Sequence, residues 1–244
     1  MHLSGNTVLI TGGTSGIGLA LARQFHANNN RVIITGRDAA KLASAEKELP
    51  GIHTFQIDHA DPASAISLRN YIRDHHPTLN VLINNAGVQF SYAFGRDPAS
   101  AGNIATETQI NFIAPLLLTN ALLPLLAAQP LSAIVFVSSA LYIAPKRSAP
   151  VYCATKAAIH TFAKALRYQL EGSSVKVFEI VPPLVDTAMT ADRSSGKMSP
   201  DRLARIFIRN FRGDVTEQHI GKSRLLKMLF RISPRLAERM MKNG

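Results

Sequence analysis

Six short runs of β-branched and other apolar residues alternate with longer helical patterns along most of the chain, and this alternation constrains the fold most strongly. The runs cover residues 7–11, 31–35, 52–57, 80–84, 133–138 and 175–181, and helical periodicity marks residues 16–29, 38–49, 61–76, about 106–128 and 152–171. The runs are almost continuously apolar, which is typical of strands that are covered on both faces. The pattern predicts an α/β fold, a doubly wound parallel sheet with helices on both faces.

The composition favours one globular domain. With 244 residues, of which 46% are apolar and 18% charged, the chain can bury a large core, and no repeat or linker divides it. The single cysteine, Cys153, excludes an internal disulfide and a multi-cysteine metal site, and it suits a reducing compartment. No apolar run approaches the length of a bilayer span, and residues 1–6 carry no basic leader. We therefore expect a cytoplasmic protein without a bound metal.

A glycine-rich segment follows the first predicted strand and opens the first predicted helix. It reads Thr11-Gly12-Gly13-Thr14-Ser15-Gly16-Ile17-Gly18. Glycines let the backbone turn tightly and approach a pyrophosphate, and the helix N-terminus offers free N–H groups and partial positive charge. A plain glycine-rich turn is the alternative, but the position between strand and helix favours dinucleotide binding.

The end of the second predicted strand bears on which dinucleotide is bound. An acidic residue here would bind the ribose 2′-hydroxyl of NAD, whereas this chain has Gly36 followed by Arg37. A guanidinium group suits a 2′-phosphate, so the sequence favours NADP(H), with NAD as the alternative. Arg37 could also simply precede a helix that Asp38 caps.

The fifth predicted strand is followed by three residues that can share one site. Ser139 ends the strand, and Tyr152 and Lys156 lie four positions apart on the next predicted helix, on one face. A phenol with its ordinary pKa near 10 is a poor acid or base at neutral pH, but a neighbouring ammonium favours the phenolate. An exposed tyrosine–lysine pair is the alternative, and the position downstream of a dinucleotide loop argues against it.

Together these segments resemble the short-chain dehydrogenase/reductase family over essentially the whole chain. The resemblance implies a Rossmann-type fold and a catalytic tetrad of Asn111, Ser139, Tyr152 and Lys156. It also implies the cofactor contacts Gly12, Thr14, Ser15, Gly16, Ile17, Gly18, Arg37, Asp58, Asn85, Ala86, Gly87, Tyr152, Lys156, Pro182, Val185 and Thr187. Residues 1–190 would form the dinucleotide-binding and catalytic core, and residues 191–244 a substrate lid and a basic C-terminal segment of the same domain. The helices 106–128 and 152–171 resemble the family's dimer-forming pair, so we expect a homodimer or homotetramer.

The resemblance also implies a reaction. The nicotinamide would exchange a hydride with a carbonyl or secondary alcohol while Tyr152 gives or takes the proton on the substrate oxygen. Ser139 would polarise that oxygen, Lys156 would assist Tyr152 and bind the nicotinamide ribose, and Asn111 would hold a water on a proton path to Lys156. A non-enzymatic NADP(H)-binding redox sensor is the alternative, although such sensors often lose the tyrosine or the lysine.

One departure and one closer likeness stand out. The family usually has Pro-Gly after the sixth strand, where this chain has Pro182 and Pro183, and the second proline removes an N–H and stiffens the loop. The segments 49–54 and 182–187, with the basic tail, resemble a DltE-like branch of the family. The substrate pocket is expected to draw on mostly apolar residues, which favours a hydrophobic carbonyl compound. These are Gln89, Phe90, Tyr142, Leu184, Met189 and the segment through Met198.

The positive charge is concentrated at the C-terminal end. The chain has a formal net charge of +11, and residues 191–244 hold 13 basic and five acidic residues. From Ser223 onward, apolar and basic residues recur at helical spacing, which predicts an amphipathic helix broken at Ser233-Pro234, with the serine as a cap. The favoured interpretation is that the apolar stripe packs on its own domain or a sister subunit. Contact with an anionic membrane, or a lid over the substrate, is the alternative. Net charge alone does not support nucleic-acid binding.

Overall fold

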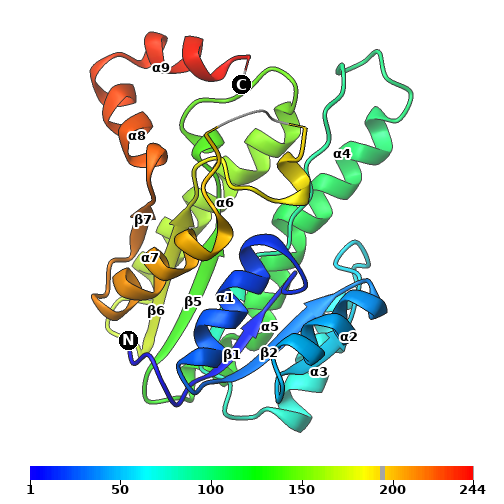
Figure 1. The fold of residues 1–244 in the computed structure, drawn as a ribbon, viewed down its shortest axis with the longest axis vertical. Coiled ribbons are helices and arrows are strands. Elements are labelled where there is room, and N and C mark those ends of the chain that lie inside the picture. Colours follow the sequence, from blue (N-terminus) through cyan, green and yellow to red (C-terminus); the bar gives the residue numbers. More distant parts are fainter. Residues whose placement is uncertain (193–195, 244) are drawn as a thin grey trace.

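The computed structural model of the chain describes residues 1–192 and 196–243 and contains one parallel sheet (Figure 1). In the described residues the sheet has seven strands in the order β3-β2-β1-β4-β5-β6-β7. The strands are β1 (Thr7–Ile10), β2 (Arg31–Gly36), β3 (His53–Gln56), β4 (Val81–Asn84), β5 (Ser132–Val137), β6 (Val175–Val181) and β7 (Glu217–His219). The six predicted strands and the doubly wound fold class are confirmed. The short edge strand β7 was not predicted, because its three residues are all polar.

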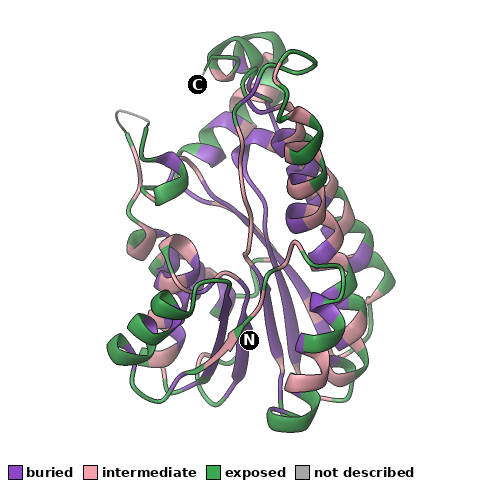
Figure 2. Ribbon diagram, turned by 90° about the vertical axis from the view of Figure 1, so that its right-hand side faces the viewer, coloured by how far each residue is buried: buried purple, intermediate pink, exposed green. Residues whose placement is uncertain are grey.

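Helices cover both faces of the sheet, as Figure 2 shows by the buried strands between partly exposed helices. They are α1 (Gly16–Ala27), α2 (Ala39–Glu48), α3 (Ser64–His75), α4 (Ser100–Thr108), α5 (Ala114–Ala127), α6 (Pro150–Gln169), α7 (Pro200–Arg212), α8 (Lys222–Ile232) and α9 (Pro234–Met241). Buried residues of α1, α2 and α7 form one core cluster with the sheet, and those of α3, α5 and α6 form the other.

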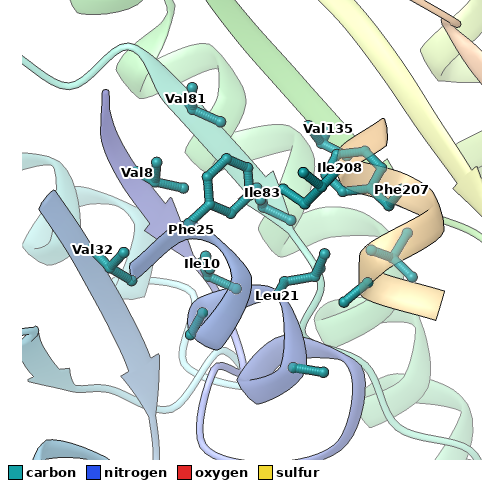
Figure 3. Close-up of a cluster of buried hydrophobic side chains, with 14 of the residues drawn as sticks. Val8, Ile10, Leu21, Phe25, Val32, Val81, Ile83, Val135, Phe207 and Ile208 are labelled. Atoms are coloured by element: carbon teal, nitrogen blue, oxygen red, sulfur yellow. The ribbon is translucent and has the colours of Figure 1, made fainter. Parts of the chain in front are cut away.

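Alternating side chains within each strand supply the two cores. In β1, Val8 and Ile10 belong to the cluster under α1 and α7, whereas Leu9 belongs to the opposite cluster. Figure 3 shows the first cluster, in which Phe25 of α1 lies close to Phe207 of α7. Their ring centroids are 6.4 Å apart. Because α7 belongs to the segment 191–244, that segment contributes to the same core as the first 190 residues. Residues 193–195 of the expected lid, and residue 244, lie outside the described residues.

The strand order places a crevice at the carboxyl edge of the sheet. The chain runs outward from β1 through β2 to β3 and then returns to place β4 on the other side of β1. Connections that leave neighbouring strands in opposite directions open a crevice at this point, where α/β folds of this kind bind their ligands. The loops after β1 and β4 therefore face each other across the expected site.

The stretch between β4 and β5 differs from the expectation of one regular helix. Here α4 and α5 are joined by a π-helical turn, Gln109–Ile113, into a continuous helix, Ser100–Ala127. This helix is long and apolar enough to cross a membrane by length and composition, which corrects the expectation that no segment is. The expectation failed because polar residues interrupt the apolar run without breaking the helix. Its inner side, with Leu118, Leu122 and Leu126, packs in the core of the sheet.

The C-terminal tail forms two helices, as predicted, and the break falls at Ser233-Pro234. Pro234 occupies the first turn of α9, but the Ser233 side chain makes no capping hydrogen bond within the described chain. Leu226 of α8 and Ala237 of α9 are buried against Ile143 and Ala144. One side of the tail therefore packs on its own domain.

Candidate active site

The glycine turn after β1 brings the backbone at the start of α1 close to the backbone of Gly12. Gly12 and Gly16 have φ of +64° and +53°, in the left-handed region that favours glycine. A Cβ on Gly18 would lie 2.2 Å from the carbonyl oxygen of Gly12, so Gly18 permits α1 to start directly against the turn. Ser15 is the N-cap of α1, and its side chain caps no N–H in the described chain. The first amides of α1 therefore remain available to an anion.

The loop after β4 is fastened to this turn. The Thr11 hydroxyl accepts hydrogen bonds from the backbone N–H groups of Asn85 and Ala86, at 3.0 Å each. The Asn85 side chain donates to the carbonyl oxygens of Thr11 and Gly12, at 2.9 and 3.1 Å. These bonds connect the two strands on either side of the crevice and fix the floor of the site.

A cleft of about 400 Å³ opens above this floor. Most of the predicted cofactor contacts line it: Gly12, Thr14, Ser15, Gly16, Ile17, Arg37, Asp58, Asn85, Ala86, Gly87, Tyr152, Lys156, Pro182 and Thr187. Gly18 lies below the turn, and Val185 is buried in the hydrophobic core. The glycine cradle, the uncapped helix terminus and the cleft fit a dinucleotide.

Two basic residues that follow β2 line the cleft, beside the acidic residues Asp38 and Asp58. Arg37 lines it, and Lys41, on the first turn of α2, lines it as well. Asp38 caps α2 by accepting hydrogen bonds from the N–H groups of Ala40 and Lys41, as the alternative interpretation predicted. Arg37 precedes the helix, and its side chain is exposed in the cleft. Sequence reasoning missed Lys41, although a second basic residue four positions after Arg37 was a usable signal.

Tyr152 and Lys156 also line the cleft, on successive turns of α6. Both side chains are almost fully buried, and the Lys156 ammonium lies 5.7 Å from the centre of the Tyr152 ring. Lys156 Nζ donates a 2.8 Å hydrogen bond to the carbonyl oxygen of Val137, at the end of β5. The helix and the strand end thus hold the phenol and the ammonium beside each other.

Asn111 lies close to Lys156 across the space beside Gly87, but neither Asn111 nor Ser139 is among the residues that line the cleft. Asn111 belongs to the π-helical turn, accepts from the Val88 N–H and donates to the Val88 carbonyl, at 2.8 Å each. A Cβ on Gly87 would lie 3.2 Å from Asn111 Oδ1 and 3.5 Å from Lys156 Nζ, so Gly87 keeps the space between amide and ammonium open. Ser139 follows β5, and its Oγ accepts from the Leu141 N–H at 3.2 Å. Its neighbour Ser138 lines the cleft.

Burial sets the protonation of the lysine. Removal from water lowers the pKa of Lys156 to about 8, and the negative charge of Glu179 opposes this shift. With a pKa near 8, the Lys156 amine is protonated in most molecules at neutral pH, yet it can release and regain its proton readily.

A polar network behind the site was missed by sequence reasoning. Glu179 is fully buried in β6, accepts from the Ser138 hydroxyl and bonds His160 Nδ1 at 2.9 Å. The Tyr142 ring stacks on His160 with centroids 3.8 Å apart, and its hydroxyl lies 2.9 Å from His219 Nε2. An acidic residue within a strand that is mostly apolar was the available signal. Ligand atoms of His160, Glu179 and Glu217 lie within 4.8 Å of one another, but Glu217 is paired with Lys227 and His160 with Glu179.

The expected substrate pocket is only partly assembled around this cleft. Met189 lines it, together with Val88 and Ile110. Tyr142 belongs instead to the polar network, and Met198 packs against the hydrophobic core. The apolar side chains of the cleft come from several elements: Ile17 of α1, Ile57 after β3, Val88 after β4, Ile110 of the π-helical turn, Val137 of β5 and Met189 after β6.

A family model described as short chain dehydrogenase matches residues 6–198. The chain belongs to the short-chain dehydrogenase family. It is 46% identical to the uncharacterised oxidoreductase DltE of Bacillus subtilis (strain 168) over 189 residues, which are 78% of this chain and 75% of DltE. The predicted DltE-like resemblance is thereby confirmed. It is 34% identical over 182 residues to the NADP-dependent 3-hydroxy acid dehydrogenase YdfG of Salmonella typhi, over 73% of this chain and 72% of that protein.

A solved structure supports the fold. The short-chain dehydrogenase from Burkholderia cenocepacia J2315, in complex with NADP, superposes with a TM-score of 0.87 over all of both chains, at 20% identity. At this identity the likeness concerns the fold alone. Membership in the family makes this chain an oxidoreductase that acts on a small molecule.

Proposed function

We propose that the protein is an NADP(H)-dependent oxidoreductase that transfers a hydride between the nicotinamide and a carbonyl compound or secondary alcohol. The observation that carries the proposal is that Tyr152 and Lys156 line the same cleft as the glycine turn after β1. The NADP in the Burkholderia structure and the NADP dependence named for YdfG add support. The two basic residues Arg37 and Lys41 favour NADP, which carries a 2′-phosphate, over NAD, which does not.

The residues present assign each end of the cofactor to a part of the cleft. The amides of the glycine turn and of the α1 N-terminus would hold the pyrophosphate, and Asp58, which lines the cleft, would contact the adenine. Asn85, Ala86 and Gly87, which line the cleft, would contact the ribose, and Pro182 and Thr187 would contact the nicotinamide. When bound, the cofactor supplies or accepts the hydride.

Side chains of the protein carry out the proton transfer to the substrate oxygen. In the reductive direction the Tyr152 hydroxyl donates to the substrate oxygen, and the neighbouring Lys156 ammonium stabilises the phenolate left behind. Ser139 Oγ donates to the same oxygen and orients it. Asn111, across the space beside Gly87, holds the water through which Lys156 exchanges its proton with solvent.

A paired cofactor screen tests this function. The protein is mixed with NADPH or NADH and with hydrophobic aldehydes, ketones, quinones and 3-oxo acids, and cofactor oxidation is followed by absorbance. We expect oxidation of NADPH, faster than of NADH, with at least one class of carbonyl compound. If NADPH binds but is not consumed with any of them, the protein is a redox sensor and the proposal is wrong.

We further propose a homodimer or homotetramer that uses the long helix and α6. Less than half of the apolar window in Ser100–Ala127 is buried, and Leu117 of α5 is exposed. The Leu117→Glu variant should dissociate to monomers in sedimentation velocity, whereas Ile66→Glu, on the exposed face of α3, should not. A monomeric wild-type protein contradicts this assembly.

A further inference from the structure

The outer side of the C-terminal helices carries apolar residues that the fold does not use. The inner residues Leu226 and Ala237 are buried, and the Lys242 carbonyl accepts from the Arg147 N–H at 3.0 Å, so both helices are fixed to the domain. On the opposite side Leu225, Ile232 and Met240 are exposed by 65%, 82% and 63%. Met228 and Leu236 are exposed between them. We call these five residues, with the basic side chains beside them, the tail face.

The exposed apolar residues fall on one side of each helix, and we call the two rows together the stripe. Leu225, Met228 and Ile232 are separated by three and four positions on α8, so their side chains lie on one side of that helix. Leu236 and Met240 repeat the spacing on α9. Five large apolar side chains exposed on two consecutive helices are more than scattered surface residues provide, and they mark an interaction site.

Basic side chains flank the stripe. Arg224, Arg231, Arg235, Arg239 and Lys242 are all exposed. None of the five forms an ion pair with another residue of the described chain, whereas Lys227, on the inner side, pairs with Glu217. Glu238 is the only acidic residue between positions 222 and 243. The tail face therefore offers apolar area and uncompensated positive charge together.

We infer that the tail face docks the protein on an anionic lipid bilayer. Two copies facing each other through it would bring like charges together with one glutamate per chain to offset them. A nucleic acid would use the arginines but gain nothing from Leu225 and Ile232. An anionic bilayer accommodates both features, because the apolar side chains enter the headgroup boundary while the arginines contact acidic headgroups.

The place of these helices gives the docking a consequence for the site. Met241 of α9 packs against a cluster that includes Tyr152 and Leu141, and Figure 1 shows α8 and α9 at the same end of the molecule as the chain beyond β5. Docking through the tail face would hold the Tyr152 end of the cleft near the bilayer. This suits a substrate that partitions into lipid, and the inference stands whether or not the proposed reaction is correct.

Vesicle sedimentation of the full-length protein tests the inference. The probes are vesicles of phosphatidylcholine with phosphatidylglycerol, and vesicles of phosphatidylcholine alone. We expect binding to the anionic vesicles, little binding to the neutral ones, and loss of binding at high salt. The variants Leu225→Ser/Ile232→Ser and Arg231→Gln/Arg235→Gln/Arg239→Gln should each weaken binding about tenfold or more.

Matched controls separate the tail face from bulk charge. The variant Arg202→Gln/Arg205→Gln/Arg209→Gln removes the same charge from exposed positions on α7, and it should bind as the wild type does. Circular dichroism verifies that each variant is folded. The inference is wrong if the wild type binds neither vesicle, or if the α7 variant loses as much binding as the tail variants. It is also wrong if Leu225→Ser/Ile232→Ser converts a dimer to a monomer without lipid, or if duplex DNA binds more tightly than the anionic vesicles.

Discussion

At the scale of single residues, the site depends on a lysine that is kept charged inside the protein. Burial lowers the pKa of Lys156 to about 8, and the buried carboxylate of Glu179 is the group that raises it. Glu179 does not line the cleft, so it acts on the chemistry through Lys156 and is a positioning residue. Its hydrogen bonds from Ser138 and His160 hold the carboxylate in place.

This arrangement predicts a shift in the pH dependence of the reaction. Glu179→Gln keeps an acceptor for Ser138 and His160 but removes the negative charge, so the pKa of Lys156 should fall below about 8. The alkaline limb of the kcat profile should therefore move to lower pH, while the acid side changes little. The profile is measured across pH with saturating NADPH. An unchanged limb, or one that moves to higher pH, would show that Glu179 has only a structural role.

Also at this scale, Arg37 and Lys41 should select the cofactor. Loss of either charge-assisted contact to a 2′-phosphate should raise the KM for NADPH about tenfold or more and leave the KM for NADH nearly unchanged. Lys47→Ala, at the exposed far end of α2, is the matched control. Steady-state kinetics of Arg37→Ala and Lys41→Ala with both cofactors give the answer. Equal changes for NADPH and NADH would contradict the assignment of these two residues.

At the scale of elements, the first strand–turn–helix unit should tolerate no side chain at Gly18. A Cβ there would lie 2.2 Å from the Gly12 carbonyl and 2.6 Å from Asn85 Nδ2, so Gly18→Ala must push α1 away from the turn. We expect a loss of about 1–3 kcal/mol in the free energy of unfolding and weaker NADPH binding. Gly102→Ala, in open space on α4, should be neutral or stabilising by about 0.5–1 kcal/mol. Urea unfolding compares the two, and a smaller loss for Gly18 than for Gly102 would contradict the packing described here.

The strands and helices also show which sequence signals are sufficient to predict secondary structure. Apolar runs predicted six strands because most side chains of the sheet are buried on both of its faces. The edge strand β7 contains Glu217, Gln218 and His219 and carries no such signal. In the π-helical turn that holds Asn111, each hydrogen bond spans five residues instead of the four of an α-helix, a difference that hydrophobic spacing does not resolve. The break between α8 and α9 was predictable, because proline has no N–H to donate and its fixed φ suits the first turn of a new helix.

At the scale of the whole molecule, the sequence predicted the cleft better than its surroundings. Motifs in the loops after β1, β4 and β5 were sufficient because a parallel sheet brings its carboxyl ends to one edge. Apart from the acidic residue Glu179, the network that extends to His219 was not predictable, since its members come from four separate elements and share no local pattern. The exposure of the tail face was also not predictable. Both sides of the tail are partly apolar, and the fold alone decides which side is buried.

The central claim, that Tyr152 supplies the proton, is tested most directly by removing one hydroxyl. NADPH binding and turnover are measured in Tyr152→Phe, beside Tyr168→Phe, which changes an exposed tyrosine of the same helix. We predict that Tyr152→Phe binds NADPH as the wild type does but turns over about 10²–10⁴-fold more slowly, while Tyr168→Phe is unchanged. Turnover by Tyr152→Phe within tenfold of the wild-type rate would contradict the account.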